Sequence, residues 1–289
     1  ERLNKNKDMP PSERALLTTL VYGVVSRHFT LIYIIKKYAK QGLGKLDKDI
    51  LLILELGLYQ LLYLEKIPDS DAVDESVKLA KKRNFRASGF VNAVLRSFIR
   101  DGKRIDYPKD VAARLGIEYS YSPEMTRLFM DNFGDRAASI MAALNEPPRL
   151  TLRANIMKMT AKDLAERLDV KTEPLGGVLL TAEGFDVAAD ELYRSGSFSV
   201  QDAAAYNAAI ALDPQPGELI IDMCSAPGGK AAHIAELTAD KARVIACDIY
   251  EHKIKLIEDT ARRLGLSSIE ARLLDGTKTD EILINAADR

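Results

Sequence analysis

The chain is poor in the residues that build covalent cross-links and metal sites. It has only two cysteines and three histidines in 289 residues. Two cysteines argue against a disulfide framework and indicate a reducing compartment, which we expect to be the cytoplasm. The histidines, His28, His233 and His252, are scattered without the spacing of metal ligands, so we expect no metal.

Long apolar runs and two nucleotide-binding signatures are also missing. The longest apolar stretches carry charges and are too short to span a bilayer, and no signal peptide is recognisable, so we expect no membrane partner. No Gly-x-Gly-x-x-Gly fingerprint occurs, which argues against a nicotinamide-dependent enzyme. The Gly-Gly-Lys sequence that ends at Lys230 is followed by Ala231 rather than Ser or Thr, which argues against a P-loop.

Charge is distributed unevenly along the chain. The net charge is −1 overall, but it is +7 over residues 1–100, −1 over 101–150 and −7 over 151–289. A basic first third joined to an acidic last half is the asymmetry expected of an RNA-binding module attached to a catalytic module. An ordinary solvated basic helix face would explain the charge as well.

The most informative stretch begins at Leu219 and ends at Lys230. Leu219–Asp222 is apolar and rich in β-branched residues, which predicts a short buried strand. A Pro-Gly-Gly turn follows, and Ala231–Leu237 has the composition of a helix start. A strand, a glycine-rich turn and a helix form the beginning of a nucleotide-type ligand site, because the glycines permit close approach and the first N–H groups of the helix attract an anionic or carboxylate group.

Two more strands are predicted, over Ala242–Asp248 and Ile269–Leu274, and Asp275 follows the second. Ligands of such sheets bind outside the carboxyl ends of the strands, so we expect Asp222, Asp248 and Asp275 to converge on one crevice. An acid about twenty residues beyond the glycines is where a carboxylate meets ribose hydroxyls. The alternative is that each aspartate only caps the helix after it.

The phrase Asp222-x-Cys224-Ser225-Ala226-Pro227-Gly228-Gly229-Lys230 resembles the cofactor motif of the Sun/RsmB family of RNA cytosine-C5 methyltransferases, which depend on S-adenosylmethionine. The resemblance implies S-adenosyl-L-methionine as the cofactor. It implies that its methionine part is surrounded by Cys224, Ser225, Ala226, Pro227, Gly228, Gly229 and Lys230. It also implies that Asp248 holds the ribose and that Asp275 lies at the adenine.

The first hundred residues have the pattern of a helical bundle. Helices are predicted over Arg14–Gly23, Ile50–Leu64, Asp71–Lys82 and Phe90–Arg100, and the second is apolar almost all round, which places it at the centre. The order of the phrases Leu54–Gln60, Ile67–Asp69 and Phe90–Arg96 resembles the NusB-like helical RNA-binding domain.

In the Sun/RsmB branch this domain is fused to the N-terminus of the methyltransferase. The pairing of the two resemblances therefore implies 16S ribosomal RNA as the substrate and partner. One departure is Asp74-Glu75, where the resemblance leads us to expect Asn-Glu.

Five basic residues of this region are candidate contacts to RNA phosphates: Lys78, Lys82, Arg86, Arg96 and Arg100. Their spacing of four residues would line each set along one face of a helix. Phosphate contacts supply affinity that is independent of sequence and sensitive to salt. A solvated face without a partner is the alternative.

The middle of the chain connects the two regions. Helices are predicted over Lys109–Leu115 and Ser122–Phe133, and Leu150–Asn155 predicts a strand that resembles the family's Leu-Arg-x-Asn phrase. A helix through Leu168, a strand at Val178–Leu180 and a helix at Ala203–Leu212 follow.

The expected fold is multidomain. It comprises an all-α NusB-like RNA-binding bundle at 1–108, linker helices with a small α+β subdomain at 109–210, and an incomplete α/β Rossmann-like methyltransferase fold at 211–289.

The chain lacks the catalytic cysteines that the resemblance implies. The family methylates cytosine by covalent catalysis, with one cysteine in a Pro-Cys phrase and one in a Thr-Cys phrase, and neither phrase occurs here. The chain begins at Glu1 without Met and stops at Arg289, about where a fourth strand is expected. We therefore expect these cysteines beyond Arg289, assign no catalytic residue, and expect this portion alone to be inactive. The alternative is a non-catalytic RNA-binding or antitermination-type protein that retains a cofactor fold.

Overall fold

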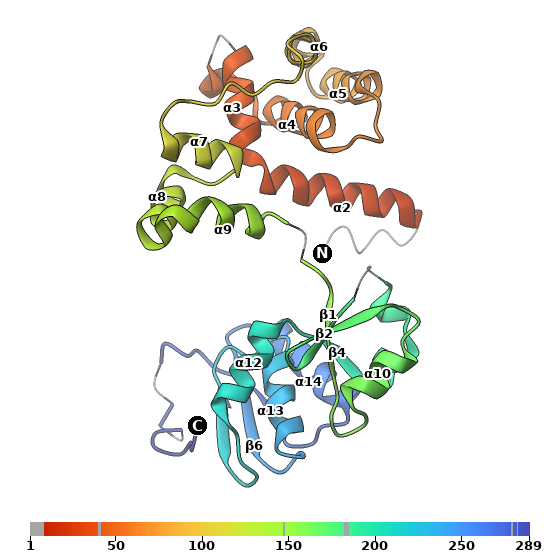
Figure 1. The fold of residues 1–289 in the computed structure, drawn as a ribbon, viewed down its shortest axis with the longest axis vertical. Coiled ribbons are helices and arrows are strands. Elements are labelled where there is room, and N and C mark those ends of the chain that lie inside the picture. Colours follow the sequence, from red (N-terminus) through yellow and green to blue (C-terminus); the bar gives the residue numbers. More distant parts are fainter. Residues whose placement is uncertain (1–8, 40–41, 147, 182–184, 279, 282) are drawn as a thin grey trace. The chain divides into compact units, whose positions relative to one another are not determined.

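The computed structural model describes residues 9–39, 42–146, 148–181, 185–278, 280–281 and 283–289 (Figure 1). The chain forms two compact units, Glu1–Pro147 and Pro148–Arg289. The finer division into three parts stays a prediction.

The first unit is helical. Its elements are α2 (Pro11–Ser26), α3 (His28–Tyr38), η1 (Leu43–Lys45), α4 (Lys48–Tyr63), α5 (Asp69–Arg83), η2 (Phe85–Ala87), α6 (Ser88–Arg100), α7 (Val111–Glu118), α8 (Pro123–Phe133), η3 (Gly134–Arg136) and α9 (Ala137–Leu144). The four helices predicted in the first hundred residues and the two predicted after them are confirmed. Helices α3 and α9 were missed.

Helix α4 lies at the centre of this unit, as its apolar sequence predicted. Leu54 and Leu58 are completely buried, and α2, α3, α5 and α6 pack around them. The Asp47 carboxylate caps the helix by accepting a hydrogen bond of 2.9 Å from the Asp49 amide. Gly57 lets α5 and α6 approach, since a Cβ there would lie 2.8 Å from side-chain atoms of Ser76 and Leu95.

Within the first unit, the α7–α8 hairpin packs against α3. The Thr30 hydroxyl of α3 donates a 2.6 Å hydrogen bond to the Ile117 carbonyl of α7. The Phe29 amide of α3 donates a 3.1 Å bond to the Ser120 hydroxyl, which lies in the turn between α7 and α8. These two bonds hold α3 against the α7–α8 hairpin.

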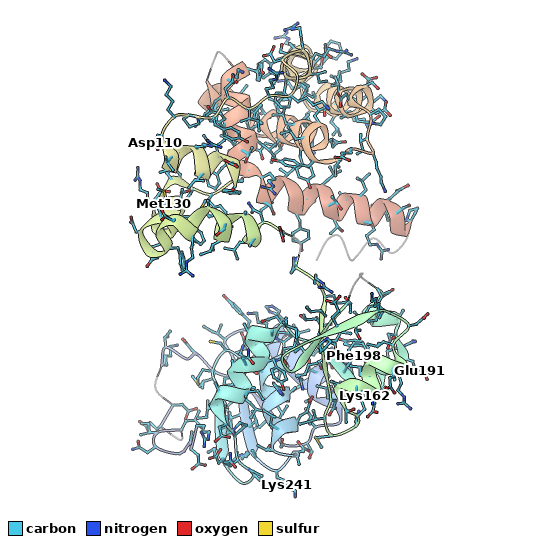
Figure 2. The ribbon with its side chains drawn as sticks, viewed as in Figure 1. Asp110, Met130, Lys162, Glu191, Phe198 and Lys241 are labelled. Atoms are coloured by element: carbon cyan, nitrogen blue, oxygen red, sulfur yellow. The ribbon has the colours of Figure 1, made fainter. Side chains whose placement is uncertain are left out.

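The second unit contains two sheets. The first is antiparallel in the order β2-β3-β1-β4, with β1 (Thr151–Ala154), β2 (Thr172–Leu175), β3 (Val178–Thr181) and β4 (Phe198–Val200). Helix α10 (Ala161–Arg167), η4 (Val187–Ala189) and α11 (Glu191–Arg194) belong to it. Phe198, labelled in Figure 2, is completely buried in its core. Strands β1 and β3 were predicted, whereas β2 and β4 were not.

The second sheet is parallel, in the order β5-β6-β7, with β5 (Leu219–Asp222), β6 (Arg243–Asp248) and β7 (Ile269–Leu273). Its helices are α12 (Ala203–Leu212), α13 (Gly229–Leu237) and α14 (Glu251–Leu264). All three predicted strands and the predicted helices are confirmed. Along the outer edge of β5 the Asp288 amide donates to the Leu219 carbonyl at 2.8 Å, and the Ile221 amide donates to the Arg289 carbonyl at 3.0 Å.

Within the described ranges, no single helix is long and apolar enough to cross a bilayer. Segments Ser12–Ser26 and His28–Tyr38 meet the length and composition criteria only together, and they are bent by 75° at their break.

Candidate functional site

The glycine-rich turn after β5 is tied to the end of β6. The Ser225 amide donates a 2.8 Å hydrogen bond to the Cys247 carbonyl, and the Cys224 amide donates to Asp222 Oδ1 at 3.3 Å. Gly228 precedes α13 with φ +98°, a conformation that favours glycine. A Cβ there would also lie 3.4 Å from the Ile257 backbone of α14. The turn therefore lies close against the sheet and the next helix.

Two polar atoms of this turn are buried without a hydrogen-bond partner among the residues that the structure describes. They are Asp222 Oδ2 and Ser225 Oγ. Buried polar atoms are nearly always paired, so these two are available to a polar ligand. Together with the first N–H groups of α13, they fit a ligand that carries both a carboxylate and an amine.

The other two predicted aspartates lie at the same edge of the sheet. Asp248 ends β6 and is 7% exposed; its Oδ1 accepts from the Tyr250 amide at 3.2 Å, and its Oδ2 lies 3.7 Å from Lys253 Nζ. The amide of Leu274 donates to the Asp248 carbonyl at 3.0 Å, which brings Asp275 beside it.

Asp275 is held by its own local turn. Its Oδ1 accepts from the Thr277 hydroxyl at 2.7 Å and from the Thr277 amide at 3.1 Å. These hydrogen bonds lower the pKa of Asp275, so its carboxylate is ionised at neutral pH. The structure thus brings Cys224–Lys230, Asp248 and Asp275 to one edge; their contact with a cofactor stays a prediction.

Cys247 does not have the environment of an activated nucleophile. Cys247 is completely buried in β6, and burial raises the pKa of its thiol, which reduces the thiolate fraction. Cys224 is exposed in the glycine-rich turn. The burial argues against Cys247 as a nucleophile, and the expectation that Cys224 is not one stays a prediction.

A buried ion pair that the sequence did not reveal links strand β1 of the antiparallel sheet to helix α13. Arg153 of β1 donates a hydrogen bond from Nη1 to Oε2 of Glu236, near the end of α13. Their side chains are 2% and 0% exposed. Burial lowers the pKa of Arg153 and raises the pKa of Glu236, and the opposite charge of each partner offsets part of these shifts. Glu236 lies on the same helix that begins at the glycine-rich turn, so the pair helps to position that helix.

Gln201 is a second residue that positions the turn. Its Nε2 donates a 3.3 Å hydrogen bond to the Gly229 carbonyl, at the start of α13. The neighbouring Asp202 caps α12 by accepting 2.9 Å bonds from the amides of Ala204 and Ala205. Gln201 therefore positions the glycine-rich turn, whereas the adjacent Asp202 caps α12.

The five candidate phosphate contacts are all exposed on α5, η2 and α6. Helices α5 and α6 pack side by side (Figure 1). Two of the five have acidic neighbours: Lys78 Nζ lies 2.6 Å from Glu75 Oε1, and Arg96 Nη2 lies 4.0 Å from Asp74 Oδ1. The remaining Lys82, Arg86 and Arg100 form no ion pair with any described residue.

The prediction that Arg86 shares a helix with Lys78 and Lys82 is wrong. Helix α5 ends at Arg83 because Asn84 is extended, with φ −151° and ψ 99°, and Arg86 lies on the separate turn η2. Its direction is therefore not set by the spacing of four residues.

Two family models match the chain. Residues 1–100 match the NusB family, and residues 209–289 match the family described as 16S rRNA methyltransferase RsmB/F. The chain thus joins a NusB-like region to a region similar to the RsmB/F methyltransferases. Both resemblances and the predicted fold class are thereby confirmed. In methyltransferases of this family and fold, S-adenosylmethionine is the general cofactor.

Curated relatives match this chain over most of its length. A probable ribosomal RNA small subunit methyltransferase B of Bacillus subtilis is 37% identical, and the match covers 97% of this chain and 64% of the relative. Its counterpart in Synechocystis is 36% identical and covers 93% of this chain and 63% of the relative. The chain thus spans less than two thirds of the length of these relatives.

Solved structures share the fold. A methyltransferase homolog from Pyrococcus horikoshii is 25% identical, with a TM-score of 0.51 over 55% of each chain. The protein PH0851 has a TM-score of 0.78 over 99% of this chain and 66% of its own; at 20% identity this likeness concerns the fold alone.

Proposed function

We propose that this chain is the RNA-binding and cofactor-binding portion of a cytoplasmic enzyme that methylates cytosine C5 in 16S ribosomal RNA. The observation that carries the proposal is the meeting of three strand ends around the glycine-rich turn, within the residues that match the RsmB/F model. The names of the relatives and the NusB match over residues 1–100 support the RNA substrate.

The proposed cofactor is S-adenosylmethionine, which supplies an activated methyl group. Cys224–Lys230 would surround its methionine part, where the first amides of α13 favour a carboxylate. Asp248 would accept hydrogen bonds from the ribose hydroxyls, and Asp275 would lie at the adenine. The two unpaired atoms, Asp222 Oδ2 and Ser225 Oγ, are suited to the polar end of the ligand.

The proposed RNA contacts are Lys78, Lys82, Arg86, Arg96 and Arg100. Their exposure on adjacent elements suits contacts to the phosphate backbone, which position an RNA without reading its sequence. No residue within 1–289 is proposed as the catalytic nucleophile.

Isothermal titration calorimetry of this chain with S-adenosylmethionine and S-adenosylhomocysteine tests the cofactor site. We expect one-site binding, weakened about 10- to 150-fold by Asp248→Ala, because a hydrogen bond to a charged group contributes about 1.5–3 kcal/mol. The control is Asp259→Ala, an exposed carboxylate of α14 that pairs with Arg262 at 2.6 Å. Equal affinities of the two variants, or no binding by a wild-type chain with an intact unfolding transition, would contradict the proposal.

A further inference from the structure

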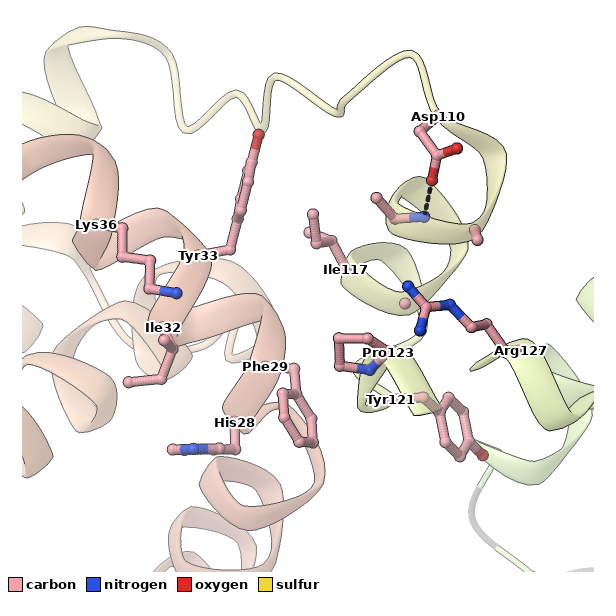
Figure 3. Close-up of a pocket in the computed structure, with 13 residues that line it drawn as sticks. His28, Phe29, Ile32, Tyr33, Lys36, Asp110, Ile117, Tyr121, Pro123 and Arg127 are labelled. Carbon is pink, nitrogen blue, oxygen red and sulfur yellow. Dashed lines mark hydrogen bonds between the residues drawn. The ribbon is translucent and has the colours of Figure 1, made fainter. Parts of the chain in front are cut away.

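A cavity of about 430 Å³ lies inside the first unit, between α3 and the α7–α8 hairpin (Figure 3). Its lining is mainly apolar and includes three aromatic rings, those of Phe29, Tyr33 and Tyr121. The Phe29 side chain is accessible, with 41% of its residue surface exposed. The hydrogen bonds that join α3 to Ile117 and Ser120 hold the two walls together, so the cavity is preformed.

Two cations border the cavity from opposite walls. Lys36 of α3 and Arg127 of α8 both line the cavity, and Figure 3 shows the Arg127 guanidinium pointing from α8 toward α3. Neither forms an ion pair or a hydrogen bond within the part of the chain that the structure describes. The one carboxylate of the lining, Asp110, is engaged as a cap, since it accepts a 2.8 Å hydrogen bond from the Ala113 amide.

The lining therefore suits an occupant with a flat apolar part and an anionic part. A volume of about 430 Å³ falls in the range of small-ligand sites, about 300–1,000 Å³, and admits one nucleotide but no double helix. Bases of single-stranded RNA are recognised by stacking on aromatic side chains, with cations at the phosphates. The basic first hundred residues, with a net charge of +7, favour an anionic occupant, and the three aromatic rings of the lining suit a nucleobase.

We propose that this cavity binds one unstacked base of single-stranded RNA, with Lys36 and Arg127 at the adjoining phosphates. This inference rests on the proposed RNA-binding function and deepens it. The basic residues of α5, η2 and α6 contact phosphates of any RNA, whereas the cavity selects an RNA with an unpaired nucleotide. His28 also lines the cavity, and its Nδ1 lies 3.2 Å from the carboxylate of Glu55, which is 2% exposed and fixes the ring.

Fluorescence anisotropy with a labelled single-stranded 12-nucleotide RNA and the matched duplex tests the proposal. Phe29→Ala is expected to weaken single-strand binding about 5- to 150-fold, the loss of one stacked base, and to leave duplex binding unchanged. Phe133→Ala is the matched control, because Phe133 is 39% exposed on the same hairpin and does not line the cavity.

Arg127→Gln is the second variant, chosen because the side chain is exposed and unpaired within the described residues. It is expected to weaken single-strand binding and to lower the salt slope by about one. With 5-iodouridine in the RNA, photo-crosslinks are expected on peptides that contain Phe29, Tyr33 or Tyr121.

Three results would overturn the proposal. Equal single-strand affinities of Phe29→Ala and Phe133→Ala, or crosslinks confined to α5 and α6, would refute the cavity while leaving RNA binding intact. A wild-type chain that binds neither RNA would refute the RNA-binding part of the proposed function as well. Phe29-dependent binding of an acidic, phenylalanine-containing peptide that RNA does not displace would assign the cavity to a protein partner.

Discussion

Replacing Arg153 with leucine is expected to destabilise the second unit by about 3–5 kcal/mol, the usual cost of leaving one buried charge without its partner. The side chain of Glu236 is completely buried, so its carboxylate cannot reach water when the guanidinium is removed. Glu236→Leu should cost a similar amount for the converse reason.

The double variant Arg153→Leu/Glu236→Leu is expected to have a free energy of unfolding within about 1 kcal/mol of that of the wild type, or higher than it. The pair is imperfectly satisfied: Arg153 Nε, Arg153 Nη2 and Glu236 Oε1 are buried without a hydrogen-bond partner in the described ranges. Its attraction therefore does little more than offset the desolvation of two charges, and apolar residues avoid that cost. A double variant as unstable as the sum of the singles would refute this reasoning.

Urea unfolding followed by circular dichroism measures these changes, since the chain has no tryptophan. The two units are expected to unfold separately, and only the transition of residues 148–289 should shift. The loss of unfolding free energy caused by Arg153→Leu should become smaller as the pH falls toward 5. Burial raises the pKa of Glu236 in the folded state above its value in the unfolded chain. A buried carboxyl with a raised pKa therefore lowers the free energy of unfolding as the pH rises above the unfolded-state pKa.

Three further predictions concern single residues. Gly57→Ala should destabilise the first unit by about 1–3 kcal/mol in urea unfolding, because the added Cβ would lie 2.8 Å from side-chain atoms of α5 and α6. Gly89→Ala should stabilise the same unit by about 0.5–1 kcal/mol, because a Cβ there meets nothing within 4 Å. Burial and a nearby arginine lower the pKa of His233 from 6.5 to about 3. The free energy of unfolding should therefore fall as the pH drops from 6.5 to about 3, by at most about 1.4 kcal/mol per pH unit. Unfolding measured at several pH values should show that His233→Phe removes this loss and that His252→Gln keeps it. Asp74→Asn should tighten RNA binding about 1.5- to 5-fold at low salt by freeing an arginine 4.0 Å away, and a weaker complex in the anisotropy assay would count against the basic face.

The elements with strong local signals could be predicted from sequence. The run Ile50–Leu64 is apolar all round, and the apolar stretch before the Pro-Gly-Gly turn marked β5. Strands β2 and β4 gave no such signal. β2 is an exposed edge strand that contains Pro174, and β4 has only three residues.

Features that depend on tertiary contact were beyond sequence reasoning. The partners of the Arg153–Glu236 pair are 83 positions apart, and no local pattern connects them. The cavity beside Phe29 forms only when α3 meets the α7–α8 hairpin. The edge of the parallel sheet was predictable because strand order alone brings its aspartates together.

Helix α13 differs from an ordinary surface helix in one respect that has consequences for sequence variation. Six consecutive residues, Ala231 to Glu236, are all buried, because β6, α12 and α14 pack around the helix and the Arg153 side chain meets its end. An amphipathic helix tolerates substitutions with a period of about 3.6 residues, since one face is free. In α13 no face is free, and four of its nine residues are alanine or glycine. A saturation mutagenesis scan should therefore find an unbroken block of intolerance from residue 231 to 236, where only small or isosteric replacements are accepted.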